Sequence, residues 1–217
     1  MTRLFWILFW AATLAGLVLT RQPAGTWPWW DSAWSLTFFV ASYAGLVSRS
    51  SLPAARLAAG VVIFSLAVVL GVGTLAGWPV GPVRFTENSG LRLGGALPLV
   101  LPLFGFALLT ASREAAGAAF PGAGRAGLAA ATAGALLLTL INGLTFLGGD
   151  RLWWLWNPWG DGAAPLRAAS SLAVLALAAA ALFFAYPPDV RLRLSRWTEG
   201  SAAWVAINAL FLAARLP

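Results

Sequence analysis

The chain has 217 residues, of which 60% are hydrophobic and only 10% are charged, and its mean hydropathy is +0.80. Soluble domains of this size carry roughly a quarter charged residues, so the composition indicates a membrane protein. The net charge of +7 does not indicate a nucleic-acid-binding protein, because the arginines are scattered singly through connecting segments and form no basic face.

Three residue types are missing, and their absence excludes several kinds of site. The sequence has no Cys, no His and no Lys, and its single Met is Met1. Disulfides, thiolate metal sites, imidazole ligands for zinc or haem, and a retinal Schiff base are therefore excluded. We expect no bound metal and no organic cofactor, so any chemistry depends on carboxylates, hydroxyls, amides, arginines and aromatic rings.

Seven apolar segments follow one another along the chain, and each is expected to be a membrane-spanning helix. They are residues 4–20, 32–47, 57–77, 93–111, 126–147, 168–186 and 202–214. A spanning helix needs about 20 apolar residues, so the last segment is short and six spans are the alternative. Backbone groups in lipid must be satisfied internally, so the predicted fold is an all-α, polytopic membrane helix bundle. It forms a single transmembrane domain over residues 1–217.

The arginines predict how this bundle is oriented. Seven spans would place eight of the 14 arginines on the amino-terminal side and six on the other side. Cytoplasmic loops carry the excess of basic residues, so the amino terminus is predicted to be cytoplasmic. The expected location is the inner membrane of a bacterium.

The three connections on the other side are rich in tryptophan and acids. Nine of the 13 tryptophans lie in or beside them, at positions 27, 29, 30, 34, 78, 153, 154, 156 and 159. Four of the seven acids also lie there: Asp31, Glu87, Asp150 and Asp161. An aromatic belt at the membrane interface is one interpretation, but a belt forms at both faces. A pocket lined by indole rings and carboxylates is the alternative, because indole faces attract cations.

The third connection carries a recognisable pattern, "PVGPVRFTENSGLRLGGALPLVLPLFGF", over residues 79–106. It resembles the first signature of the membrane carotenoid hydratases of the bisanhydrobacterioruberin hydratase type. The matching positions are Pro79, Gly81, Pro82, Thr86, Gly90, Gly95, Pro98 and Pro102. The fifth connection, "WWLWNPWGDGAAP", is similar to the family's second signature, an aromatic loop that ends in Gly and Pro. The family's usual Asp in the preceding helix is absent, and Asn142 is the nearest substitute.

The resemblance implies that water is added to the terminal double bond of an acyclic carotenoid without a cofactor. Such a reaction needs a proton donor, surroundings that stabilise a tertiary carbocation, and a positioned water. The acid candidates are Glu87 first, then Asp161 and Asp150. An ion pair of Glu87 with Arg84 or Arg92 is the alternative, and would argue against an acid role. The residues expected to bind substrate or orient water are Phe85, Thr86, Asn142, Trp153, Trp154, Trp156, Asn157 and Trp159.

Two other classes of function are alternatives to a hydratase. A divergent member of the family could bind a carotenoid without catalysis, or serve as an integral subunit of a larger membrane complex. A transporter would show ionisable residues inside its spans, and these spans are nearly free of charge. The expected partners are thus the lipid bilayer, a long polyene and other membrane subunits, with no nucleic acid.

Overall fold

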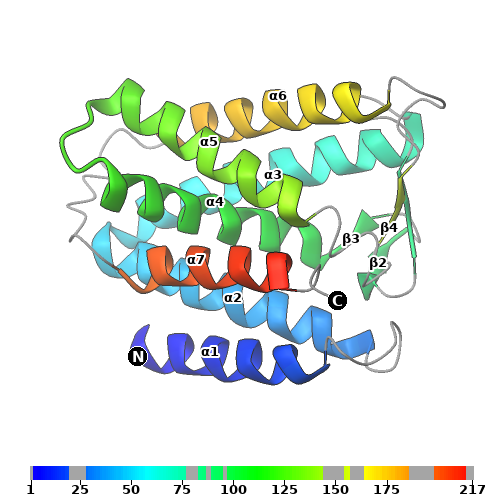
Figure 1. The fold of residues 1–217 in the computed structure, drawn as a ribbon, viewed down its shortest axis with the longest axis horizontal. Helices are drawn as coiled ribbons and strands as arrows, with labels where there is room; N and C mark the ends of the chain where they lie inside the picture. Colours follow the sequence, from blue (N-terminus) through cyan, green and yellow to red (C-terminus); the bar gives the residue numbers. More distant parts are fainter. Residues whose placement is uncertain are drawn as a thin grey trace.

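The computed structural model describes residues 2–19, 28–76, 83–86, 89–94, 97–143, 154–156, 164–185 and 198–213. These ranges form seven α-helices that pack together in one bundle (Figure 1). The helices are α1 (Thr2–Leu19), α2 (Pro28–Arg49), α3 (Leu52–Ala76), α4 (Val100–Ala119), α5 (Arg125–Gly143), α6 (Ala164–Ala185) and α7 (Glu199–Ala213).

Four short strands lie at one end of the bundle, and we call this end the loop end (Figure 1). The strands are β1 (Val83–Phe85), β2 (Arg92–Leu93), β3 (Leu97–Pro98) and β4 (Trp154–Trp156). The predicted all-α class and the number of helices are confirmed for the described residues. That every helix crosses a membrane stays a prediction.

The starts of several helices follow from proline placement. Pro28, Pro53, Pro102 and Pro165 each lie within the first three residues of a helix. A backbone N–H in the first turn has no partner inside the helix, so proline is tolerated there and its fixed φ favours helix.

The amino end of α7 is closed by a reciprocal pair of hydrogen bonds. The Thr198 N–H donates to Ser201 Oγ over 2.9 Å, and the Ser201 N–H donates to Thr198 Oγ1 over 3.1 Å. This is a capping box in which serine takes the place of the usual Glu or Gln.

The fourth helix differs from its sequence-based boundaries of 93–111. It begins at Val100, because Leu93 and Leu97 are paired in a β2–β3 hairpin instead of a helical turn. Pro98 restricts the residue before it to extended backbone, and Gly94 adopts a φ of +58° that helix does not allow. At its other end α4 continues to Ala119, so Arg113 and Glu114 lie inside a helix and not in a connection.

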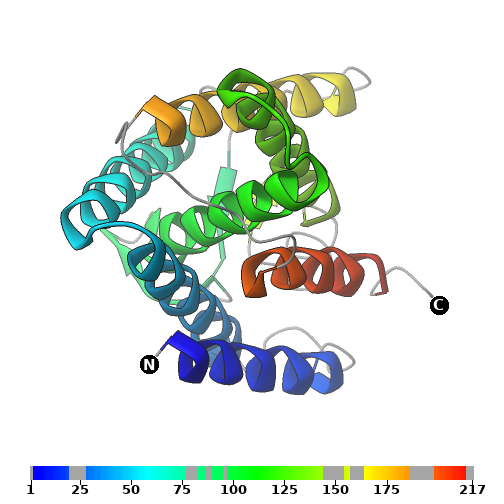
Figure 2. The same ribbon diagram turned by 90° about the vertical axis from the view of Figure 1, so that its left-hand side faces the viewer.

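Helix α4 lies in the middle of the bundle and packs against α2, α3, α5 and α7 (Figure 2). Aromatic rings fill its contact with α2: Trp34 lies 5.3 Å from Phe104 between ring centroids, and Phe39 lies 5.8 Å from Phe106. Both pairs advance in the same direction along the two helices, so α2 and α4 run parallel. The Phe9 ring of α1 stacks 4.8 Å from Phe38, which extends this aromatic core to the edge of the bundle.

A group of buried charges lies at the end of the bundle opposite the loop end. Arg49 Nη1 is 2.5 Å from Glu114 Oε1, and Arg49 Nη2 is 3.6 Å from Glu199 Oε2. The second oxygen of Glu114 accepts a hydrogen bond from the Thr198 hydroxyl at the start of α7. The carboxylate of Glu114 therefore joins α2, α4 and α7, and it faces a helix N-terminus, where negative charge is stabilised.

A second arginine lies beside this group. Arg113 is only 5% exposed, and its guanidinium carbon lies 5.7 and 5.5 Å from the ring centroids of Phe183 and Phe184. Arg125 donates to the Phe184 carbonyl near the end of α6. Cations near a helix C-terminus are favourable, so both arginines help to hold α6.

Two described helices are long and apolar enough to cross a membrane by length and composition, α3 over Leu52–Leu75 and α5 over Arg125–Gly143. The apolar stretches Thr2–Gly16 in α1 and Glu199–Ala213 in α7 are shorter than a full span. The structure thus agrees with association of the chain with a membrane, and it does not test how many helices cross it.

We expect the Arg49–Glu114 pair to dominate the stability of this end. Glu114→Gln should lower the free energy of unfolding by about 3 kcal/mol, because it leaves a largely buried arginine without its anion. Glu199→Gln is the matched control: its side chain is 50% exposed and the bridge is longer, so the loss should stay below about 1 kcal/mol. Thermal unfolding in detergent measures both, and equal losses would contradict the central place of Glu114.

A pair of glycines tests how closely α7 approaches α4. A Cβ added at Gly200 would lie 2.6 Å from Glu114 Cδ, whereas one added at Gly134 in α5 meets nothing within 4 Å. Gly200→Ala should therefore destabilise the protein by about 1–3 kcal/mol. Gly134→Ala should stabilise it by about 0.5–1 kcal/mol through helix propensity alone. Chemical denaturation curves of both variants are the measurement, and a stable Gly200→Ala protein would contradict the close approach.

Candidate functional site at the loop end

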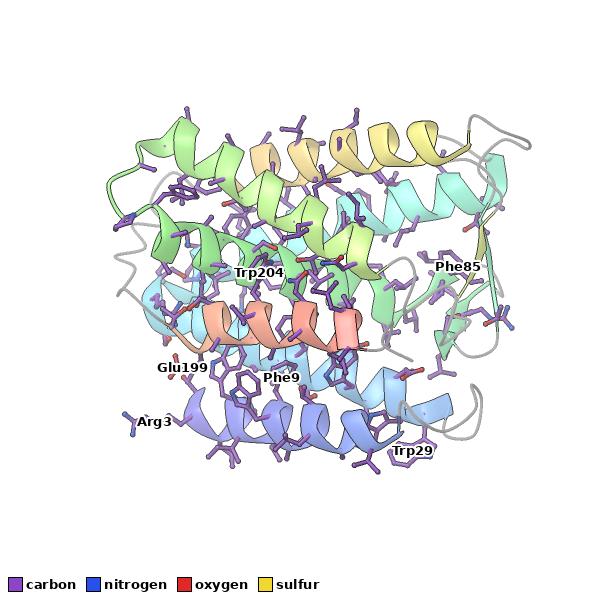
Figure 3. The ribbon with its side chains drawn as sticks, viewed as in Figure 1. Arg3, Phe9, Trp29, Phe85, Glu199 and Trp204 are labelled. Carbon is purple, nitrogen blue, oxygen red and sulfur yellow. The ribbon has the colours of Figure 1, made fainter. Side chains whose placement is uncertain are left out.

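Two distant segments of the chain meet at the loop end as paired strands. β1 runs antiparallel to β4, with Val83 opposite Trp156, Arg84 opposite Leu155 and Phe85 opposite Trp154. One described strand of the third connection and one of the fifth therefore lie side by side, joined through their backbones. Phe85 and Trp29 both lie at this end, whereas Arg3 and Glu199 lie at the other (Figure 3).

The chain after β1 turns tightly and is held by its own hydrogen bonds. The N–H and the hydroxyl of Ser89 both donate to the Thr86 carbonyl, over 3.2 and 2.6 Å. Arg92 Nη1 donates to the Phe85 carbonyl over 3.2 Å. The Arg92 guanidinium thus binds the backbone of β1. Together with the two Ser89 bonds, this contact connects the residues before position 87 to those after position 88.

The first turn of α2 also reaches this segment. Gly90 has a φ of +82°, and a Cβ added there would clash with the Ser32 hydroxyl and lie 3.6 Å from Ser32 Cβ. Only glycine satisfies both the left-handed backbone and the close approach. The start of α2, which follows the first connection, therefore touches the loop after β1. Because β1 of the third connection pairs with β4 of the fifth, all three meet at one end of the bundle.

The structure places some of the predicted site residues here. Phe85 is buried at 5% exposure in β1, and Thr86, which directly follows it, is half-buried. Trp154 and Trp156 form the two ends of β4. The following predicted site residues lie outside the described residues: Glu87, Asp150, Trp153, Asn157, Trp159 and Asp161.

Asn142 belongs to a hydrogen-bonded network between α5 and α7. Its Nδ2 donates to Asn208 Oδ1 over 3.0 Å, and Asn208 Nδ2 donates to Thr139 Oγ1 over 3.0 Å. The network is buried, and Gly143 beside it lies against the Phe211 ring. Hydrogen bonds of this kind hold helices together in an apolar bundle. This arrangement supports a packing role for Asn142 in addition to the predicted one.

The sequence pattern assigned no role to Asp31, one of the acids in the tryptophan-rich connections. It lies in the first turn of α2, is 8% exposed, and directly precedes Ser32. A signal was present in the spacing: Asp31, Ser35 and Phe38 recur at positions i, i+4 and i+7, which share one face of a helix. Ser35 and Phe38 are both 0% exposed, so this face points into the bundle.

No set of three carboxylates close enough to hold a metal ion occurs within the described ranges. Within the described ranges, this end of the bundle has one carboxylate, Asp31, together with hydroxyls and aromatic rings beside an apolar interior. Those groups suit proton transfer and the stabilisation of a cation.

The chain matches no protein-family model, no curated protein and no solved structure. Interpretation of the site therefore depends on its own residues and geometry.

The β1–β4 pairing can be tested with introduced cysteines, because the natural chain has none. Arg84 and Leu155 are direct partners, and opposed residues in an antiparallel pair have Cα atoms about 4.5–5.5 Å apart. That separation allows a disulfide. We expect the Arg84→Cys/Leu155→Cys variant to cross-link under mild oxidation, as seen by its mobility on a denaturing gel.

The matched control for the cross-link combines Arg84→Cys with Ser51→Cys, since Ser51 is exposed between α2 and α3 at the opposite end. This control should stay reduced within each molecule. Equal cross-linking of the two variants, or none in the first, would contradict the pairing of the third and fifth connections.

Proposed function

We propose that the chain is an integral membrane protein that adds water to the terminal double bond of an acyclic carotenoid. The observation that carries this proposal is the β1–β4 pairing. The two segments it joins are those that resemble the signatures of the carotenoid hydratases, and they are about 70 residues apart in the sequence. A hydratase site built from both signatures needs them to be neighbours.

Exposed apolar side chains support the membrane part of the proposal. On α1, Leu4, Ile7, Leu14 and Val18 are between 57 and 69% exposed, and Phe64 on α3 is 71% exposed. Apolar surface of this extent on a soluble monomer would promote aggregation, whereas a bilayer would cover it. Together with α3 and α5, which are long enough to span, these faces favour seven spans with lipid around the bundle.

The positions of the arginines support a cytoplasmic amino terminus. Arg3, Arg49, Arg56, Arg113 and Arg125 belong to helix ends opposite the loop end. Basic residues collect on the cytoplasmic side, so we place that end, and the amino terminus, in the cytoplasm of a bacterium. The loop end then faces the outer side of the inner membrane.

The proposed reaction begins with protonation of the alkene by Glu87, which directly follows Thr86. A tertiary carbocation forms, and aromatic surfaces stabilise it. Asp150 and Asp161 are the other acid candidates of the two joined connections. A long polyene would lie along the lipid-facing side of the bundle, with only its end among the polar groups of the loop end.

A non-catalytic role in carotenoid binding or in a larger membrane complex is the second candidate. The observation that favours it is the tight hydrogen bonding after β1, where Ser89 and Arg92 both bind main-chain carbonyls. Such a loop resists rearrangement around a reacting substrate and suits a fixed binding surface.

The two candidates separate when Glu87 is changed. We expect Glu87→Gln to lower the rate of hydration by at least about 100-fold, because a glutamine cannot donate the proton. The assay uses full-length protein in liposomes that contain an acyclic carotenoid, and it follows the gain of one water by mass spectrometry. Glu199→Gln, at the opposite end, is the matched control and should hydrate at the wild-type rate.

A second measurement is whether wild-type protein retains a carotenoid during purification. Wild-type protein that retains a carotenoid but never hydrates it would support the binding role and refute the enzyme. An active Glu87→Gln variant would transfer the acid role to Asp150 or Asp161.

A further inference from the structure

Two arginines from neighbouring helices meet at the carboxyl-terminal end of α6. The guanidinium carbon of Arg113, on α4, lies 5.5 Å from the centroid of the Phe184 ring. Arg125, the first residue of α5, donates a hydrogen bond to the Phe184 carbonyl. The start of α5 and the end of α6 both lie at the end of the bundle opposite the loop end (Figure 1). Two positive charges are therefore gathered at one residue of α6.

No described carboxylate forms a salt bridge with either of these arginines. The acids described at this end are Glu114 and Glu199, and both form their salt bridges with Arg49. Glu114 directly follows Arg113 in the chain, but its carboxylate is bound to Arg49 of α2. A guanidinium has five N–H donors, and ring faces and one carbonyl use only part of them, so the two arginines can still bind an anion.

The two arginines differ in how they can meet an anion. Arg125 is exposed, and the Phe184 carbonyl is bound by only one of its nitrogens. Arg113 is only 5% exposed, and its guanidinium lies against the rings of Phe183 and Phe184. A buried charge is screened less than an exposed one, so Arg113 adds to the positive potential around Arg125. Arg125 therefore offers the direct contact with an anion, and Arg113 strengthens it.

An exposed apolar face on α6, which we call the α6 stripe, runs toward the two arginines. Val174 and Leu177 are 61 and 58% exposed, and Ala178 and Ala181 are exposed as well. These positions recur at i, i+3, i+4 and i+7, which share one face of a helix. At a rise of 1.5 Å per residue, the α6 stripe lies about 5 to 15 Å from Phe184 along the helix. An acyl chain on this face would bring its headgroup to the arginines.

We propose that this end of α6 binds an anionic phospholipid, with its phosphate on Arg125 and an acyl chain along the α6 stripe. Guanidinium–phosphate pairs are charge-assisted and strong, and basic sites between helices on the cytoplasmic side suit anionic headgroups. The α6 stripe favours a lipid over free phosphate, because a soluble anion gains nothing from exposed apolar side chains. This site needs only the membrane location proposed above and is independent of hydration.

The first test counts the lipids that stay bound after extraction. Full-length protein is reconstituted in vesicles of equal parts phosphatidylglycerol and phosphatidylcholine, extracted in mild detergent and measured by native mass spectrometry. We expect wild type to retain phosphatidylglycerol at least about 10-fold more often than phosphatidylcholine, and Arg125→Gln to lower this preference about 5-fold. Arg3→Gln is the matched control and should keep the wild-type preference, because Arg3 is exposed at the same end but lies on α1 (Figure 3).

The second test measures stability in the vesicles. The unfolding temperature of wild type should be higher in phosphatidylglycerol than in phosphatidylcholine, and this difference should shrink in Arg125→Gln but not in Arg3→Gln. Arg125→Gln also loses its hydrogen bond to the Phe184 carbonyl, which lowers the unfolding temperature equally in both kinds of vesicle. Only the difference between the vesicles therefore reports lipid binding.

Three results would overturn the lipid site. They are equal retention of the two lipids by wild type, an Arg125→Gln variant with the wild-type preference, and stabilisation by inorganic phosphate in phosphatidylcholine vesicles that equals the effect of phosphatidylglycerol. If Arg125→Gln does not fold, the lipid and phosphate comparisons on wild type decide. Protein that prefers phosphatidylglycerol but never hydrates a carotenoid contradicts only the hydratase proposal, and protein that does not insert into vesicles contradicts both.

Discussion

The ion pair between Arg49 and Glu114 is the interaction on which the arrangement of the helices depends. Glu114 lies in the central helix, and its two oxygens bind α2 through Arg49 and α7 through Thr198. Burying a carboxylate is unfavourable unless it is paired and hydrogen-bonded, and both conditions are met here. Because Gly200 lets α7 come close to the carboxylate, the pair also sets the position of the last helix.

Helix α2 transmits this constraint to the loop end. One end of α2 is held by Arg49, and the other touches the loop after β1 through Ser32 and Gly90. Between these points its buried face packs on α4 through Trp34, Phe38 and Phe104. The aromatic contacts fix the parallel register of the two helices, so the position of α4 determines where α2 begins.

The buried polar contacts between helices share one role, which is to specify which helices pack together. Apolar side chains distinguish poorly between one apolar helix neighbour and another, whereas a buried hydrogen-bonding group has few possible partners. The Asn142–Asn208–Thr139 network and the Glu114–Thr198 bond both involve α7, which is short and lies at the edge. Specific polar contacts therefore determine the position of α7, because this helix is the shortest of the seven and has the least apolar length for packing.

The sequence by itself determined the helical class, the number of helices and most of their boundaries. Apolar runs, first-turn prolines and polar connections are local features of the sequence, so they predict helices without knowledge of which segments pack together. It did not reveal that Leu93 of β2 pairs with Leu97 of β3 or that Arg113 and Glu114 continue α4. Hydropathy counts leucines in either state, and a buried ion pair depends on Arg49, which lies 65 residues away from Glu114.

The candidate site likewise combines features that are visible in the sequence with features that only the fold determines. The two signature segments are visible as sequence, but only the tertiary structure decided that β1 pairs with β4 and that the first turn of α2 reaches Gly90. Asp31 looked like one acid among four in the tryptophan-rich connections, because burial is a property of the packed bundle. Strand pairing and helix contact join residues far apart in the chain, and no local pattern of charge or hydropathy specifies which of them will meet.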